Sequence, residues 1–234
     1  MFDFSRFQWM SFDCYGTLID WETGILGYLR PLLRGKGCAV SDPQILALYS
    51  EIEPRVQAGP YRTYRDVLGG VVRQFAQELR FEVSTAEAAG LAESIRDWQP
   101  FSDTFDGLRR LHSRYKLAVL SNIDDDLFAG TSAKLQVPFD AVITAQQARS
   151  YKPSLNNFET LLRRLDILPA RLLHVAESLY HDVASAQQLG ISTVWVNRRQ
   201  GKQAAASRLA DVKADLEVMN VGQLAELAVT ARHP

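Results

Sequence analysis

The chain is poor in cysteine, in long apolar runs and in net charge. Its two cysteines, Cys14 and Cys38, cannot build a disulfide framework, and no zinc-site spacing is present. No apolar run approaches the roughly 18 residues that span a membrane, and the opening MFDFSRFQWM is too polar for a signal peptide. The 26 basic and 27 acidic residues nearly balance, which gives no electrostatic reason to expect nucleic acid. We therefore expect a cytoplasmic protein that binds neither nucleic acid nor a membrane.

What the chain does contain is a series of short apolar runs rich in Val, Ile and Leu, which is typical of strands buried on both faces. The runs are residues 7–12, 116–121, 140–144, 172–176, 192–196 and 215–219. Amphipathic helical patterns, such as those of residues 105–115 and 156–165, separate the later runs. This alternation predicts an α/β fold with a Rossmann-like parallel sheet and right-handed crossovers.

The segment that follows the first strand interrupts this alternation. Residues 21–98 contain several amphipathic helical patterns and no clear strand. The simplest architecture is an α/β core domain made of residues 1–19 and 99–234, into which residues 20–98 insert a helical cap domain.

Polar side chains stand where four of the predicted strands should end. They are Asp13, Tyr15 and Thr17 after the first strand, Ser121 and Asn122 after the second, Lys152 after the third, and Glu177 and Asp182 after the fourth. Open α/β sheets bind ligands in the crevice outside the carboxyl ends of their strands. A lone Asp13 would be as consistent with a structural cap as with catalysis, but four polar strand ends together favour a catalytic site.

Four segments, in this order along the chain, resemble the four motifs of the haloacid dehalogenase superfamily. They are FDCYGTLID, LAVLSN, SYKPS and HVAESLYHD. The resemblance covers essentially the whole chain, and it implies that Asp13 is a catalytic nucleophile. It also implies that Ser121, Lys152, Glu177 and Asp182 are the functional residues of the later motifs, and that the helical insertion is the cap.

Position 15 bears on the branch of this superfamily. The phosphatases carry a second aspartate two residues after the nucleophile, which protonates the leaving group, whereas this chain has Tyr15. A halide leaves without a proton, and both D-x-Y-G-T-L and VWVNR (residues 194–198) resemble the type II 2-haloacid dehalogenases. The resemblance implies hydrolysis of a small halogenated carboxylic acid through an aspartyl ester, without a metal or other cofactor. Related dehalogenases are often dimers, so a homodimer is one expectation.

The chain departs from the best-known L-2-haloacid dehalogenases at four positions. Their cap arginine falls at Ser50, and the tyrosine that follows their third motif falls at Phe158. The serine and asparagine of their fourth motif fall at Glu177 and Leu179. The site is therefore not a copy of those enzymes.

The residue types suggest a division of roles. Asp13 must be ionised to attack carbon, and Lys152 is the cation that would offset the cost of burying it. Thr17 and Ser121 can donate hydrogen bonds to Asp13 or to a substrate carboxylate. Asp182 would hold Lys152 or orient the hydrolytic water, although it could also be an acidic residue at a helix N-terminus.

The remaining candidates concern water and substrate. Glu177 could act as the general base for the hydrolytic water. Tyr15 and Asn122 are candidates for substrate binding. The cap offers Arg55, Arg62 and Arg65 as bidentate partners for a substrate carboxylate, although each could equally lie on a solvated helix face. The small basic cluster of Arg198, Arg199 and Lys202 is expected to be a solvated loop, with a phosphate or dimer contact as the alternative.

Two other functions remain open on the same fold. In a magnesium-dependent phosphatase, Asp13 and Glu177 would supply two carboxylate ligands to the ion. Tyr15 is the weak point of that alternative. The other is a binding protein without catalytic activity, against which the intact set of Asp13, Lys152 and Asp182 argues.

Overall fold

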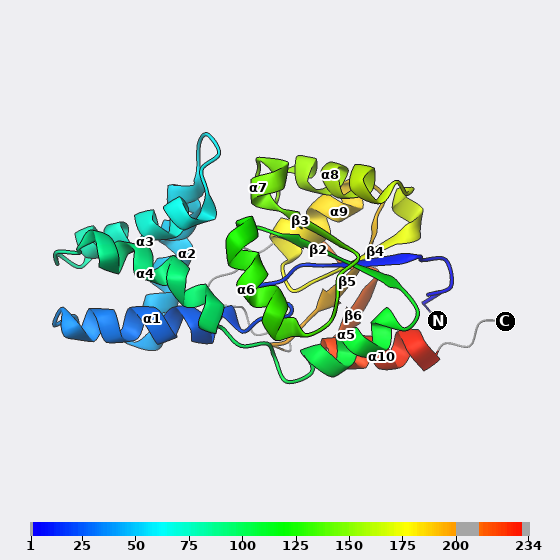
Figure 1. The fold of residues 1–234 in the computed structure, drawn as a ribbon, viewed down its shortest axis with the longest axis horizontal. Helices are drawn as coiled ribbons and strands as arrows, with labels where there is room; N and C mark the ends of the chain where they lie inside the picture. Colours follow the sequence, from blue (N-terminus) through cyan, green and yellow to red (C-terminus); the bar gives the residue numbers. More distant parts are fainter. Residues whose placement is uncertain (1, 200–210, 231–234) are drawn as a thin grey trace.

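A six-stranded, fully parallel sheet forms the centre of the larger lobe in the computed structural model, which describes residues 2–199 and 211–230 (Figure 1). Its strands are β1 (Trp9–Phe12), β2 (Lys116–Ser121), β3 (Ala141–Thr144), β4 (Leu172–Ala176), β5 (Ser192–Val196) and β6 (Leu216–Val218). Each strand falls within one of the six predicted runs. The predicted α/β fold with a parallel sheet is confirmed.

The order of the strands, β3-β2-β1-β4-β5-β6, determines where the site can be. The chain moves from β1 to β2 and β3 on one side, and β4 then returns to the other side of β1. Phe12, the last residue of β1, is level with Val119 of β2 and Val175 of β4. The strand order therefore reverses between β1 and β4, and the crevice at such a point is where α/β proteins bind ligands. Asp13 follows β1 directly into this crevice.

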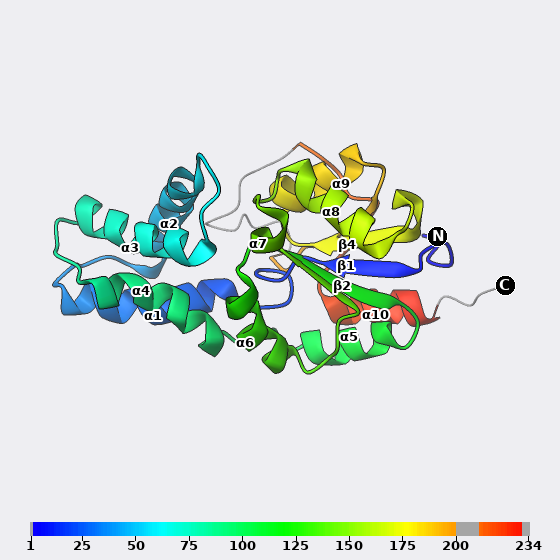
Figure 2. The same cartoon turned by 45° about the horizontal axis from the view of Figure 1, so that its top comes forward.

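Helices cover both faces of the sheet (Figures 1 and 2). One face carries α5 (Thr104–His112) and α10 (Val221–Thr230), and the other carries α8 (Leu155–Leu165) and α9 (Ala184–Gln188). The elements α6 (Asp125–Leu135), α7 (Ala145–Ala148) and the 3₁₀ turn η2 (Pro169–Arg171) also lie in the connections between strands. Strand residues such as Leu120 and Leu173 are buried under these helices. Burying each such side chain stabilises the fold by about 1.5–3 kcal/mol.

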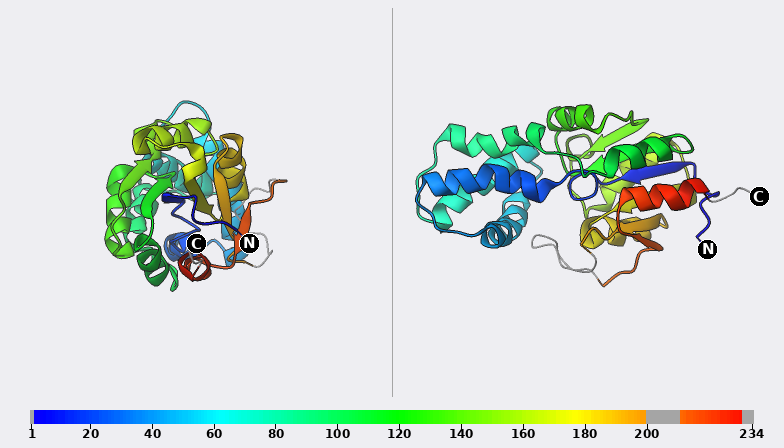
Figure 3. Two further views of the ribbon diagram at one scale, coloured as in Figure 1. Left: turned by 90° about the vertical axis from the view of Figure 1, so that its right-hand side faces the viewer. Right: turned by 90° about the horizontal axis from the view of Figure 1, so that it is seen from below.

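A bundle of four helices extends from the end of the sheet at which β1 finishes (Figures 1 and 3). It consists of α1 (Trp21–Gly35), α2 (Asp42–Gln57), α3 (Tyr64–Glu78) and α4 (Thr85–Ser94), followed by the short 3₁₀ turn η1 (Ile95–Asp97). No strand lies between α1 and η1, all of whose residues the structure describes. That residues 20–98 constitute a separate cap domain stays a prediction.

Two chain segments run side by side between the bundle and the sheet. Asp20 N–H donates to the carbonyl of Gln99 at 2.9 Å, and Phe101 N–H donates to the carbonyl of Leu18 at 3.0 Å. The buried indole of Trp98 packs directly on Gly24 of α1. The connection between the two lobes is therefore a paired, packed element. None of the helices in the described ranges is both long and apolar enough to cross a bilayer.

The contact between Gly24 and Trp98 predicts a position-specific loss of stability. A Cβ atom on Gly24 would lie 2.4 Å from atoms of the Trp98 ring, whereas a Cβ atom on Gly27 of the same helix would meet nothing within 4 Å. We expect Gly24→Ala to lower the free energy of unfolding by about 1–3 kcal/mol because of overpacking. Gly27→Ala should raise it by up to about 1 kcal/mol, because alanine favours helix. Urea titration measures both, and equal effects would contradict this packing.

Candidate active site

The buried ammonium group of Lys152 is the centre of a polar cluster at the carboxyl edge of the sheet. Its Nζ donates to Asp13 Oδ1 at 2.8 Å, to Asp182 Oδ1 at 2.6 Å and to the carbonyl of Leu120 at 3.0 Å. All three N–H bonds of an ammonium group are thereby used. Burial alone would lower the pKa of Lys152, but the two carboxylates outweigh it and the pKa is raised. Lys152 is therefore positively charged although only 2% exposed.

Asn122 holds the backbone of Lys152 in place. The amide N–H of Lys152 donates to Asn122 Oδ1 at 2.7 Å, and Asn122 Nδ2 donates to the carbonyl of Lys152 at 3.1 Å. Asn122 follows β2 directly, so the end of β2 fixes the loop that carries the lysine. Both ends of the Asn122 amide serve this purpose, although the residue also borders the cavity described below.

Asp13 accepts a hydrogen bond at each carboxylate oxygen. Lys152 occupies Oδ1, and the Thr17 hydroxyl donates to Oδ2 at 2.7 Å. That hydroxyl accepts the backbone N–H of Glu177 at 2.9 Å, so its own proton is directed at Asp13. Burial raises the pKa of Asp13, and the ammonium of Lys152 opposes that rise. The turn after β1 thus presents a carboxylate whose orientation is fixed from two sides.

Asp182 is bound by two buried donors. It lies in the π-helical turn η3 (Leu179–Val183), and its Oδ1 receives Lys152 Nζ and, at 2.9 Å, His174 Nε2. His174 Nδ1 in turn lies 2.8 Å from Ser11 Oγ. Burial would raise the pKa of Asp182, but Lys152 and His174 lower it to about 2. Asp182 is therefore an ionised partner that holds Lys152.

Sequence reasoning missed His174 and Ser11. His174 is a single polar residue within the buried strand LLHVA, and Ser11 is the single hydroxyl residue within FQWMSF. The two are paired in register across β1 and β4. An isolated polar residue in each of two adjacent buried strands is the signal that could have indicated this contact, because buried polar groups need partners.

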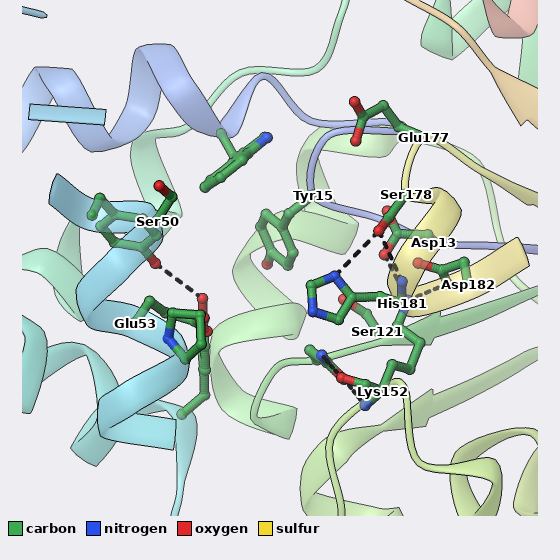
Figure 4. A pocket seen from close by; sticks show the side chains of 15 residues that line it. Asp13, Tyr15, Ser50, Glu53, Ser121, Lys152, Glu177, Ser178, His181 and Asp182 are labelled. Carbon is green, nitrogen blue, oxygen red and sulfur yellow. Dashed lines mark hydrogen bonds and ion pairs between the residues drawn. The ribbon is translucent and has the colours of Figure 1, made fainter. Parts of the chain in front are cut away.

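A cavity of about 130 Å³ lies between this cluster and helix α2 (Figure 4). Seven of the predicted site residues line it: Asp13, Tyr15, Ser121, Asn122, Lys152, Glu177 and Asp182. Thr17 stands directly behind Asp13 through its hydrogen bond. Within the part of the chain that the structure describes, Ser121 Oγ is buried and has no hydrogen-bond partner. A substrate atom in the cavity could satisfy it.

Glu177 borders the cavity beside Asp13, and its pKa is raised to about 7. Burial is the main cause, the negative charge of Asp13 adds to it, and Arg199 opposes it. A carboxyl group with this pKa can exchange a proton near neutral pH. Tyr15 is different, because burial raises its pKa well above the usual value and its hydroxyl lies 2.8 Å from Thr131 Oγ1. Tyr15 therefore does not replace the acid that phosphatases carry at this position.

The structure does not bring the three candidate arginines of the insertion to the cavity. Arg55 donates to Glu78 at 3.3 Å, Arg62 donates to the carbonyl of Val56, and Arg65 pairs with Glu93 and Asp126. The side of the cavity formed by the helical bundle is instead lined by Trp21, Tyr49, Ser50, Glu53, Pro54 and Tyr64. Sequence reasoning missed Tyr49 and Glu53 as site residues, although their spacing of four places them on one face of a helix.

The expectation of a solvated basic loop is wrong for Arg198. Its guanidinium donates to the carbonyl of Thr17 at 2.6 and 2.9 Å, and it pairs with Asp103 at 2.8 Å. The side chain is only 11% exposed. Arg198 thus holds the turn that follows the Asp13 strand, and Lys202 lies outside the described residues.

The donor set offers little to a resident metal ion. Within residues 2–199 and 211–230, no group of three or more His, Cys, Asp or Glu side chains is placed to hold one. Asp13 and Glu177 are the two carboxylates of the magnesium alternative, yet both oxygens of Asp13 already accept hydrogen bonds. A raised pKa also makes Glu177 a poorer ligand at neutral pH. That the protein works without a metal ion stays a prediction.

Fold and site together define a Rossmann-like α/β protein with a buried carboxylate–ammonium cluster at its topological switch point. Residues 8–190 match the family of haloacid dehalogenase-like hydrolases. The chain belongs to this family of hydrolases.

Individual relatives agree with this assignment. An (S)-2-haloacid dehalogenase of Xanthobacter autotrophicus is 26% identical over 219 residues, which cover 92% of this chain and 85% of the relative. The solved L-2-haloacid dehalogenase of the same organism, with chloropropionic acid covalently bound, shares the fold with a TM-score of 0.82 at 21% identity; the match covers 97% of this chain and 100% of that one. A glyceraldehyde 3-phosphate phosphatase of Methanothermobacter thermautotrophicus is 31% identical over 102 residues, which cover 42% of this chain and 45% of the phosphatase.

The cluster predicts that Lys152 supports both activity and folding. Lys152→Ala would leave Asp13 and Asp182 as neighbouring buried carboxylates without their cation. We expect the free energy of unfolding to fall by roughly 3–5 kcal/mol, the usual cost of breaking a buried ion pair. We also expect turnover to fall at least about 10²-fold. Lys213→Ala, at an exposed position, is the control. Unfolding and turnover like those of the control variant would show that Lys152 is dispensable.

Proposed function

We propose that the protein is a 2-haloacid dehalogenase with Asp13 as its nucleophile. The observation that carries this proposal is the ionised Lys152 at 2.8 Å from Asp13, at the wall of a small cavity. A carboxylate held beside a buried cation is available to attack carbon. Tyr15 occupies the position at which phosphatases carry the acid that protonates their leaving group. The names of the relatives that match most of the chain support the same chemistry.

The reaction takes two steps. An Asp13 carboxylate oxygen attacks C2 of the substrate, and the halide leaves with the electron pair of the carbon–halogen bond. Water then attacks the carboxyl carbon of the aspartyl ester. The bond from that carbon to the substrate oxygen breaks, the oxygen takes up a proton as a 2-hydroxyacid, and the Asp13 carboxylate re-forms. Two easier steps replace one difficult displacement by water.

Two further residues have roles in this scheme. The unpartnered Ser121 hydroxyl is a hydrogen-bond donor for the substrate carboxylate. Glu177 is the general base that takes a proton from the attacking water, because it borders the cavity beside Asp13. Lys152 keeps Asp13 ionised in the first step, and in the second it polarises the ester carbonyl. No metal ion takes part in this proposal.

Product analysis decides between this function and the phosphatase alternative. We expect halide release from short 2-haloacids and no phosphate release from phosphate monoesters. Exhaustive chelation should leave the halide rate unchanged. Adding magnesium should not create phosphatase activity, because Tyr15 cannot protonate the leaving group. Magnesium-dependent phosphate release that disappears in Glu177→Gln would assign the site to the phosphatases instead.

The covalent step can be followed with isotopic label. In a single turnover in H₂¹⁸O with enzyme in excess, water attacks the aspartyl ester, so the label should enter the carboxylate of Asp13. The 2-hydroxyacid should carry no label in that first turnover. Mass spectrometry of the peptide containing Asp13 and of the product measures both. Label in the product with an unlabelled Asp13 would mean that water attacks the substrate directly.

Glu177 gives the reaction a defined pH dependence. A base works only when deprotonated, so ester hydrolysis should increase as the pH rises through about 7 and level off above it. It should fall below that range as Glu177 takes up its proton. Glu177→Gln should be slow and flat with pH, whereas Glu159→Gln, an exposed position, should keep the wild-type profile. Stopped-flow measurement of ester decay separates this step from halide release, and a Glu177→Gln profile that still rises near pH 7 would remove Glu177 from the role.

A further inference from the structure

A buried histidine that the proposed reaction does not use stands behind the catalytic cluster. His174 lies in the middle of β4, is fully buried, and is not among the described residues that line the cavity. Its Nε2 lies 2.9 Å from Asp182 Oδ1, the same oxygen that accepts Lys152 Nζ at 2.6 Å. Its Nδ1 lies 2.8 Å from Ser11 Oγ. Asp182 therefore links His174 to the residues around the cavity.

The charge of Asp182 decides which nitrogen of His174 carries a proton. Burial would raise the pKa of Asp182, but Lys152 and His174 lower it to about 2. The carboxylate is therefore ionised and can only accept hydrogen bonds. Its contact with His174 requires a proton on Nε2. The state of the other nitrogen, Nδ1, is set by the hydrogen bond that it makes with Ser11.

The contact with Ser11 indicates an uncharged imidazole. The Ser11 hydroxyl is fully buried, and Nδ1 is its hydrogen-bond partner among the described residues. If Nδ1 carried a proton, Ser11 would accept it, and the buried proton of Ser11 itself would have no acceptor, which native structures avoid. If Nδ1 is bare, the hydroxyl donates to it, and each N–H and O–H of the pair has an acceptor. His174 is then neutral, with its proton on Nε2.

Each carboxylate beside Lys152 thus has one neutral donor behind it. Asp13 receives the Thr17 hydroxyl at Oδ2, and Asp182 receives the His174 imidazole at Oδ1. Without that imidazole, Lys152 would be the remaining side-chain donor to Asp182 in the described part of the chain. A carboxylate that loses one of two donors attracts the other more strongly. The ammonium group would then move toward Asp182 and away from Asp13.

We propose that His174, as a neutral imidazole oriented by Ser11, is a positioning residue that balances the pull of Asp182 on Lys152 and so keeps the ammonium group against Asp13. This inference rests on the proposed dehalogenase function, in which Asp13 attacks carbon and Lys152 then polarises the ester. His174 does not line the cavity, so its loss should lower kcat and leave KM little changed.

Two substitutions of similar length separate the hydrogen bond from packing. The amide of His174→Gln keeps an N–H that can reach Asp182, whereas His174→Met fills the same space without a donor. We expect kcat for chloride release from 2-chloropropionate to fall at least about tenfold in His174→Met, because a misplacement of about 1 Å can cost roughly 10²-fold. His174→Gln should keep most of the wild-type kcat. Equal losses in the two variants, or no loss in His174→Met, would overturn the proposal.

Thr193→Val is the matched control. Thr193 of β5 is paired in register with His174, is equally buried, and donates from its hydroxyl to Asp215 at 3.1 Å. Its substitution also removes a buried hydrogen bond, but one that does not reach the cluster. The free energy of unfolding should fall and kcat should stay at the wild-type value. A loss of kcat as large as that of His174→Met would show a general effect of buried polar deletions and overturn the assignment.

The protonation of His174 can be measured without any substrate. In ¹⁵N NMR of the histidine rings, the signals of His174 are assigned by their absence in His174→Gln. We expect a protonated Nε2 and a bare Nδ1 in the wild type. Ser11→Ala should change the Nδ1 signal, because that nitrogen loses its donor. A proton on Nδ1 in the wild type, with or without a second one on Nε2, would overturn the neutral donor.

The position of Lys152 keeps this inference separable from the proposed function. Crystal structures of the two variants should show Lys152 Nζ farther from Asp13 Oδ1 in His174→Met than in His174→Gln. Equal distances would overturn the positioning role whatever the activities. If no 2-haloacid is hydrolysed, the dehalogenase function fails, and the expected difference in distance would still support the role of His174 in placing Lys152.

Discussion

The whole site depends on one buried ammonium group between two carboxylates. Taking Lys152, Asp13 and Asp182 out of water costs several kcal/mol for each ion, which is recovered only if every donor and acceptor finds a partner. The fold supplies those partners from four places: the end of β1, the carbonyl of Leu120 in β2, the loop after α7 and the turn after β4. The strand order that sets β1 between β2 and β4 is therefore also what makes the charged cluster tolerable.

The same cluster limits what its cation can do. Because Lys152 uses all three N–H bonds within the protein, it orients Asp13 and supports its charge, but it has no further N–H bond to offer a substrate carboxylate. In the proposed function, substrate recognition then falls to Ser121 and to the helical bundle. The bundle contributes Glu53 and aromatic rings to the cavity and keeps its arginines in ion pairs and hydrogen bonds elsewhere. The same kind of nucleophilic chemistry can act on different substrates when the residues that line the cavity differ.

Rigid contacts around the catalytic turn support this arrangement. Thr17 links Asp13 to the backbone of Glu177, so one hydroxyl holds both the acid proposed to form the ester and the acid proposed to hydrolyse it. Arg198 donates hydrogen bonds to the carbonyl of Thr17 and is itself paired with Asp103. The environment of Glu177 is drier and more negative than that of an ordinary glutamate, and this raises its pKa into the neutral range.

The sequence by itself determined the sheet, its parallel direction and the group of Asp13, Ser121, Lys152 and Glu177 at its edge. Strand periodicity and strand-end position are local properties, and parallel strands bring their carboxyl ends together. Only the tertiary structure decided the rest. Contacts between His174 and Ser11 and between Arg198 and Thr17 join residues far apart in the chain, and Glu53 lines the same cavity as Asp13. Which of several arginines or acids faces a cavity depends on how one helix packs and rotates against its neighbours, and no single stretch of sequence encodes that rotation.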